Sequence, residues 1–275
     1  MTADVNRRVL PGFALSLGYT MFYLSLVVLV PMAAGVWKAS SLSLDAFWSA
    51  VSSERAVAAY LLTLWVSFAS AAINIVLGVL VAWVLVRYDF PLKRLFDSLV
   101  DFPFALPTAV AGLVYSSLLV KGGWYGRFLV PLGIQGAYSR LGIVVVLVFI
   151  GFPFVVRTLQ PVLEGLERDV EEASACLGAN RFQTAIRVIL PSITPAIITG
   201  FALAFARSLG EYGSVVFISG NMPFRTEIAP VLVVARLEEF NYAEATAIAV
   251  VLLGISFVTL FAINLIERWS SRHHG

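Results

Sequence analysis

Arg207 and Glu211 are the two charged side chains in the apolar run at residues 192–218. They stand four residues apart, so on a helix they share one face and can form an ion pair. Charged groups inside a membrane-spanning segment are costly and usually face the protein interior or a water-filled cavity. Two interpretations stay open: Arg207 lines or gates the path of an anion, or the pair is structural and supports a helix bundle.

An earlier apolar segment, residues 101–108, is interrupted and reads DFPFALPT. Its two prolines each remove a backbone donor and bend or break a helix. Either the freed amides of a broken helix compensate an oxyanion for lost water, or the prolines only shape the packing. The residues expected to line the path are Pro103, Pro107, Thr108, Arg207, Ser208, Glu211, Tyr212 and Ser214.

The segment 163–191 is polar but lies between strongly apolar stretches. Its first part has an apolar and an acidic face at helical spacing, which predicts an amphipathic helix. The apolar face comprises Leu163, Leu166, Val170, Ala173 and Leu177. Gly178 suits a left-handed helix end, Asn180 can cap a second helix, and Pro191 is expected to end it. The sequence therefore predicts two short helices with a tight turn at Gly178–Ala179, an arrangement suited to docking another protein.

The elements that position these residues are predicted to lie in a membrane. Hydrophobic residues make up 59% of the 275 residues, charged residues only 13%, and the mean hydropathy is +0.88. An ordinary soluble domain is about half apolar. Because an α-helix satisfies its own backbone hydrogen bonds in lipid, this composition predicts an all-α, multi-pass membrane protein.

Six apolar blocks approach or exceed the length of about 20 residues that a spanning helix needs. The first is longer than the apolar part of a secretion signal, about 7–15 residues, so we interpret it as a spanning helix. The predicted spans are 13–37, 57–86, 101–119, 141–156, 192–218 and 242–266. The chain then divides into an N-terminal segment with the first span and an external loop (1–56), a transmembrane domain (57–266) and a tail (267–275).

The distribution of lysine and arginine predicts the orientation. With six spans, eleven of these residues fall on the side of the termini and the polar helix pair, and seven on the other side. Positive residues are enriched in cytoplasmic loops. We therefore expect both termini and the helix pair to be cytoplasmic.

Motifs for several enzymatic activities are absent from the sequence. No lysine is followed by Ser or Thr, so there is no phosphate-binding loop of the form GxxxxGK[ST]. No HExxH or GxSxG occurs, which argues against a zinc protease or serine hydrolase of these types. We expect no metal site and no cofactor in this chain, which is then not itself an enzyme. ATP and Mg²⁺ would be bound and used by a partner.

The polar helix pair carries a family signature. Glu172-Ala173-Ser174 is followed after three residues by Gly178 and after nine more by VILP at 188–191. This resembles the EAA signature of permease subunits of binding-protein-dependent ABC importers of the type I fold, with Ser174 for an alanine and Val188 for an isoleucine. In that family the segment forms a coupling helix that docks in a groove of the ATPase subunit. The resemblance implies that the ATPase-coupling residues are Glu171, Glu172, Ala173, Ser174, Leu177, Gly178, Ala179 and Asn180, with the small residues allowing close approach.

Five further segments resemble the T-type permeases of the sulfate and thiosulfate branch of this family. They are 101–113, 123–126, 153–164, 207–221 and 236–249. The resemblance implies import of sulfate or thiosulfate across a bacterial inner membrane. It also implies a related W-type permease, two copies of an ATPase and an extracytoplasmic sulfate-binding protein as partners, besides membrane lipid, with no role for nucleic acid.

Three alternatives remain at this stage. A molybdate or tungstate permease is the nearest, because these oxyanions are also tetrahedral. An intramembrane enzyme would need paired catalytic residues at matching depth, and Arg207 with Glu211 supplies neither a nucleophile nor a metal site. A structural or assembly subunit would tolerate substitutions at Arg207 or Pro107 without loss of uptake.

Overall fold

The computed structural model describes residues 13–166 and 168–272. These residues form helices joined by turns and loops, with no β-strand among them, which confirms the predicted all-α class for this part of the chain. Residues 1–12 and 273–275 lie outside the described residues. The first of these ranges contains Arg7 and Arg8, two of the eleven positive residues counted on the side of the termini.

The helices have the following bounds. They are α1 (Phe13–Leu24), the π-helical η1 (Ser25–Leu29), α2 (Val30–Ala39), α3 (Leu44–Val51), α4 (Glu54–Arg87), α5 (Lys93–Val100), α6 (Phe102–Ala105), α7 (Thr108–Leu119), α8 (Gly126–Leu129), the 3₁₀ turn η2 (Val130–Leu132), α9 (Arg140–Glu164), α10 (Arg168–Cys176), α11 (Arg181–Thr184), the π-helical η3 (Ala185–Ile189), α12 (Leu190–Leu209), α13 (Val215–Ile218), α14 (Ala229–Glu238) and α15 (Tyr242–Arg272).

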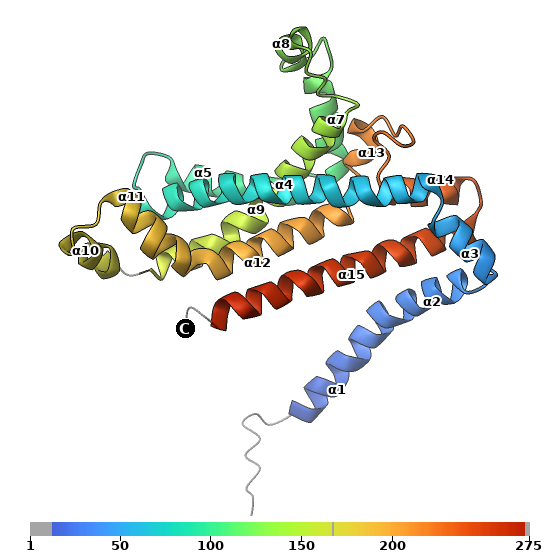
Figure 1. The fold of residues 1–275 in the computed structure, drawn as a ribbon, viewed down its shortest axis with the longest axis horizontal. Helices are drawn as coiled ribbons and strands as arrows, with labels where there is room; N and C mark the ends of the chain where they lie inside the picture. Colours follow the sequence, from blue (N-terminus) through green and yellow to red (C-terminus); the bar gives the residue numbers. More distant parts are fainter. Residues whose placement is uncertain (1–12, 167, 273–275) are drawn as a thin grey trace, which may run out of the picture.

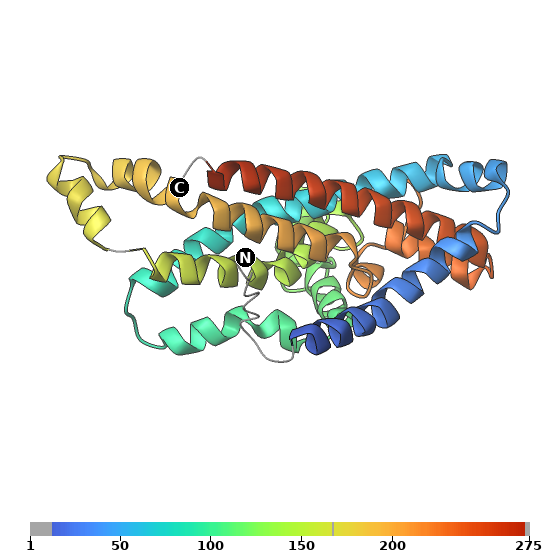
Figure 2. The same ribbon diagram turned by 90° about the horizontal axis from the view of Figure 1, so that it is seen from below.

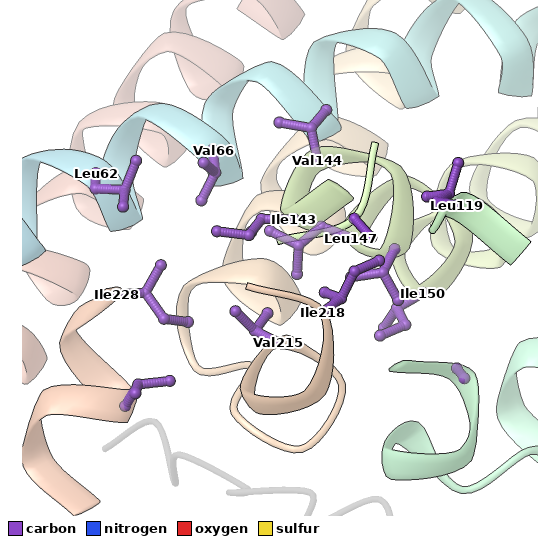
Figure 3. Packing of buried hydrophobic residues seen from close by; sticks show 14 residues of the cluster. Leu62, Val66, Leu119, Ile143, Val144, Leu147, Ile150, Val215, Ile218 and Ile228 are labelled. Atoms are coloured by element: carbon purple, nitrogen blue, oxygen red, sulfur yellow. The ribbon is translucent and has the colours of Figure 1, made fainter. Parts of the chain in front are cut away.

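Three long helices, α4, α9 and α12, pack against one another and form the centre of the molecule (Figures 1 and 2). The 34 residues of α4 correspond to about 50 Å of helix, longer than the hydrocarbon core of a bilayer. Figure 3 shows Leu62 and Val66 of α4 facing Ile143 and Leu147 of α9, with Ile218 of α13 beside them. This buried apolar cluster joins the long helices to the short segments that follow α12.

Five helical segments of the described chain are long and apolar enough to cross a membrane. They are Leu15–Ala39, Glu54–Arg87, Arg140–Glu164, Arg181–Leu209 and Tyr242–Glu267. None of the apolar window of the first segment is buried within this chain. The main contact of that segment with the rest of the chain is between α2 and α15. Its exposed apolar surface is therefore suited to contact lipid or another chain.

The predicted third span, 101–119, is interrupted near its start, as its two prolines led us to expect. Leu106, which precedes Pro107, has an extended backbone (φ −90°, ψ 127°), as expected for a residue before proline. The 12-residue helix α7 begins directly afterwards. At about 18 Å it is too short to cross the hydrocarbon core alone.

The fourth predicted span, 141–156, is too short. The helix α9 continues through Pro153 and Pro161 to Glu164. Val155, Val156 and Leu159 are fully buried against the neighbouring helices. This packing offsets the missing proline donors and keeps the helix intact.

The fifth predicted span, 192–218, has both boundaries wrong. Helical structure runs without a break from Arg181 to Leu209, because the π-helical η3 leads directly into α12 and Pro191 lies in the first turn of α12. A proline is tolerated in a first turn, and the wider π register already disrupts the usual hydrogen bonds there. At the other end the helix stops at Gly210, so residues 210–214 form a turn before α13.

Candidate functional site

The polar helix pair, formed by α10 and α11, has the predicted turn. Gly178 adopts a left-handed conformation with φ +84°, which glycine reaches at no steric cost. Asn180 forms a capping box with Gln183: the Asn180 Oδ1 accepts from the Gln183 amide at 2.8 Å, and the Gln183 Oε1 accepts from the Asn180 amide at 2.9 Å. The end of one helix and the start of the next are therefore fixed by local interactions.

The first helix of the pair begins later than predicted. Leu163 belongs to α9 and is buried in the core, and Leu166 lies between α9 and α10. Val170 on α10 and Leu177 in the turn directly after it are exposed, with Leu177 at 89%. Phe182 on the second helix is 72% exposed. An apolar surface of this kind at the end of a membrane protein is suited to contact another protein.

Ser174 was expected to face a partner, but it is buried within the helix pair. Its side chain is buried, and its hydroxyl lies 2.8 Å from that of Thr184, with which it shares a hydrogen bond. Ser174 therefore holds the two helices of the pair together. Glu172 and Ala173 are exposed and Ala179 is half-buried, so these neighbours remain available for contact.

Glu171 is joined to the central bundle. Its Oε1 lies 2.7 Å from Nη2 of Arg87, the last residue of α4. Arg87 also donates to the carbonyl of Leu166 at 3.2 Å. Neither contact was predicted from the sequence.

The helix pair projects beyond the central bundle in both views (Figures 1 and 2). The carboxyl end of α15 lies at the same end of the molecule. The pair therefore lies at one end of the bundle, and α3 and α14 lie at the other (Figure 1).

The second group of predicted residues meets where α12 ends. Arg207 Nη2 lies 2.9 Å from Glu211 Oε2. The Glu211 side chain is only 2% exposed, and its Oε1 accepts hydrogen bonds from the amide and the hydroxyl of Ser214 at 3.0 and 3.1 Å. The Arg207 side chain is 37% exposed. The pair therefore combines a buried carboxylate with a guanidinium group that can still be reached.

The interrupted segment 101–108 lies against this turn. A Cβ on Gly213 would lie 2.5 Å from the Thr108 Oγ1, and a Cβ on Gly112 would overlap the carbonyl of Ser214. The start of α7 and the turn after α12 are therefore in close contact. The structure brings together Thr108, Glu211 and Ser214, which the sequence placed in two separate candidate segments.

The remaining predicted path residues differ in exposure. Ser208 is 2% exposed, and its hydroxyl lies 3.3 Å from that of Ser70 in α4. Tyr212 is half-buried and packs against the apolar cluster of Figure 3. Pro103 is buried within the short helix α6, and Pro107, which precedes α7, is exposed.

A polar cluster that the sequence did not single out joins α5 and α6 to α9. Arg157 donates to both carboxylate oxygens of Asp101 (2.8 and 2.6 Å) and to Asp97 Oδ1 at 2.6 Å. Gln160 donates to the same oxygen of Asp97 at 2.9 Å. The hydrogen bonds to its carboxylate hold the pKa of Asp97 below its usual value of 3.8. The bond from Gln160 contributes most, followed by the bond from Arg157.

A cavity of about 750 Å³ lies along α4 and is lined mainly by apolar residues such as Leu61, Trp65 and Phe68. No candidate path residue lines it. Within the described residues there is no group of three or more His, Cys, Asp or Glu side chains placed to hold a metal ion.

Solved structures with the same arrangement of helices define the class of the fold. The chain superposes on a chain of a bacterial alginate ABC transporter in complex with an alginate-bound periplasmic protein, with a TM-score of 0.76 over 93% of both chains at 18% identity. A chain of the MetNI methionine ABC transporter matches with a TM-score of 0.61 over 83% of this chain and 99% of its own length, at 19% identity. The fold is that of a membrane subunit of an ABC transporter.

Sequence relatives then give the family. Residues 74–273 match the family described as the inner membrane component of binding-protein-dependent transport systems, and the chain belongs to that family. It is 52% identical to the protein named sulfate transport system permease protein CysT of Synechocystis, over 92% of this chain and 89% of that one. It is 48% identical to the protein of the same name from Salmonella typhimurium, over 97% and 96% of the two chains. The resemblance drawn from the sequence motifs is confirmed.

Proposed function

We propose that this chain is a permease subunit of an ATP-driven importer that carries sulfate, and thiosulfate as a second substrate, into the cell. The proposal rests on sequence identity. About half of the residues are identical to those of permeases named for sulfate transport, over more than nine-tenths of this chain. These relatives do not favour the molybdate and tungstate alternative. An extracytoplasmic binding protein would deliver the anion, and a related W-type permease would supply the other half of the path.

In this proposal the helix pair receives the force of ATP hydrolysis. Its exposed apolar residues, Leu177 and Phe182 among them, dock on an ATPase subunit that binds ATP and Mg²⁺. Closure of the two ATPase subunits displaces the pair. Because η3 and α12 continue from its second helix, the displacement is passed to the central bundle and switches the side to which the path is open.

The anion passes Arg207 at the surface between the two permeases. Glu211 offsets most of the charge, so Arg207 attracts a divalent anion without binding it tightly, and release stays fast. The break at Pro107 lets α7 contact the turn that holds Glu211.

We further propose that the segment of α6 and α7 completes a sixth span, with the partner permease covering the part of the membrane that α7 does not cross. With six spans, the distribution of positive residues supports a cytoplasmic position for both termini and the helix pair. The chain then lies in the inner membrane with α3 and α14 facing outward.

Uptake of radiolabelled sulfate by cells that carry the whole importer tests this function, with unlabelled thiosulfate, molybdate and tungstate as competitors. We expect competition by thiosulfate and little by molybdate. Competition by molybdate without any by thiosulfate would contradict the assignment.

Coupling is tested with Glu172→Ala and Gly178→Pro, which should abolish uptake and weaken association with the ATPase while the subunit remains inserted. The control is Asp89→Asn, which removes a fully exposed carboxylate at the same end of the bundle. Normal uptake by both coupling variants would refute the docking role, and normal uptake by Arg207→Gln would favour a purely structural subunit.

A further inference from the structure

We infer that the ion pair between Arg87 and Glu171 transmits the movement of the helix pair to α4, so that α4 moves together with α9 and α12. The inference rests on the proposed coupling function. Arg87 would act as a positioning residue, because it contacts neither the anion nor the ATP.

The chain connects the helix pair directly to α9 and α12, but not to α4. The chain links α10 to α9 on one side, and it links α11 through η3 to α12 on the other. The helix α4 is not adjacent to the helix pair in the sequence, although it packs against both α9 and α12 along the bundle. A force on the pair therefore reaches α4 through side-chain contacts. The contact at its last residue, Arg87, is the one nearest to the pair along α4.

Arg87 contacts three parts of the molecule. Its guanidinium group lies 2.7 Å from Glu171 of α10. It donates at 3.2 Å to the carbonyl of Leu166, in the connection between α9 and α10. It also lies 5.5 Å from the ring centre of Trp83, one turn earlier on α4, within range of a cation–π contact. One side chain thus holds the end of α4, the connection after α9 and the first helix of the pair.

The ion pair is partly buried. The Arg87 side chain is 12% exposed and that of Glu171 is 30% exposed. Exposed ion pairs contribute little because water and salt screen them, whereas a partly buried pair is screened less. The nearby pair Lys93–Asp89 is a contrasting case, because the Asp89 side chain is fully exposed. It connects only neighbouring residues at the end of α4 and the start of α5.

The experiment uses the complete importer in proteoliposomes with its sulfate-loaded binding protein. Sulfate uptake and ATP hydrolysis are measured in the same vesicles for Arg87→Gln, Glu171→Gln and the double variant. Arg94→Gln and Asp89→Asn are the matched controls, because each removes the same kind of charge from an exposed side chain at the same end.

We expect each single variant to lower the sulfate transported per ATP hydrolysed by about three- to tenfold. The double variant should be no worse than the more severe single one, because both remove the same interaction. The controls should stay within about twofold of the wild type. A defect of folding alone would lower uptake and ATP hydrolysis together and would leave their ratio unchanged.

Two results would overturn the inference: a normal ratio for Glu171→Gln, or effects of the two single variants that multiply in the double variant. If Arg87→Gln does not assemble, Glu171→Gln decides, because its position on the partly exposed helix pair tolerates the change. Failure of the proposed function is recognised separately, by a wild-type complex that does not import sulfate or by normal uptake with Glu172→Ala.

Discussion

Glu211 carries a negative charge in an almost fully buried position just after α12. Burial of a carboxylate is costly unless it is paired and hydrogen-bonded. Here Arg207 supplies the opposite charge, and Ser214 supplies two hydrogen-bond donors. The carboxylate therefore fixes the turn at residues 210–214 and orients Arg207. This structural role is compatible with the proposed position of Arg207 on the path of the anion.

Substitutions of this pair should have unequal effects on transport. Arg207→Gln removes the positive charge and should lower sulfate uptake by about tenfold or more, the size expected when a charged hydrogen bond is lost. Glu211→Gln keeps an acceptor for Ser214 and leaves Arg207 charged, so uptake should fall by about threefold or less. Initial rates at equal membrane abundance provide the comparison. An equal or larger loss for Glu211→Gln would contradict an attractive role of Arg207.

Asp97 gives a prediction about pH. Its pKa in the folded protein is lowered by Gln160 and Arg157, so the bonds to its carboxylate stabilise the fold at pH values above the ordinary pKa of 3.8. This contribution is lost as the pH falls through the lower, folded pKa. The difference in unfolding temperature between the wild type and Asp97→Asn should be constant from about pH 5 to 8 and shrink below about pH 4. A difference that grows toward acid pH would be inconsistent with this assignment.

At the scale of the elements, the helix pair depends on its capping box. Asn180→Ala removes the bond to the Gln183 amide and should destabilise the start of α11 by about 1 kcal/mol. Hydrogen exchange of the amides at 182–184 should become about fivefold faster, as that free energy implies. Exchange in α12 should not change. Unaltered exchange at 182–184 would mean that packing, and not the cap, holds this helix.

The contact between α7 and the turn after α12 is tested with two glycines. Gly112→Ala places a methyl group against the backbone carbonyl of Ser214 and should destabilise the subunit by about 1–3 kcal/mol. Gly254→Ala in α15 meets open space, so stability should be unchanged or up to about 1 kcal/mol higher. Thermal unfolding in detergent compares the two variants. Equal unfolding temperatures would show that the turn does not pack closely on α7.

Local signals predicted some of these elements correctly. The turn at Gly178 and the cap at Asn180 depend on nearby residues, and both are present as expected. The long helices were predicted less well, because the span 141–156 stopped short of Glu164 and Pro191 was expected to end a helix. Burial of the surrounding apolar residues keeps α9 helical through Pro153, and the π-helical η3 leads directly into α12 at Pro191. A local motif reveals neither feature.

At the scale of the whole molecule, contacts between distant segments were the least predictable. Ion pairs join segments that are far apart in the sequence: Arg87 pairs with Glu171, and Arg157 pairs with Asp97 and Asp101. A single sequence contains no periodicity that pairs such residues. The meeting of Thr108 with Gly213 was also not foreseen, although both segments had been identified as candidates for the path.

The apolar surface of the first candidate span is exposed in the isolated chain, which indicates that molecules around the chain cover it. None of the window within Leu15–Ala39 is buried in the chain, compared with 50% for Arg140–Glu164. Lipid and the proposed second permease would cover this surface. The helix pair would be covered by an ATPase subunit in the same way.

In the proposed function, the helix pair couples ATP hydrolysis on a partner to the movement of sulfate. Sulfate uptake and ATP hydrolysis in vesicles that contain the complete importer with Glu172→Ala test this coupling. We expect loss of sulfate uptake together with weaker binding of the ATPase, while the permease remains inserted and folded. Uptake and ATPase binding equal to those of the wild type would rule out the coupling role.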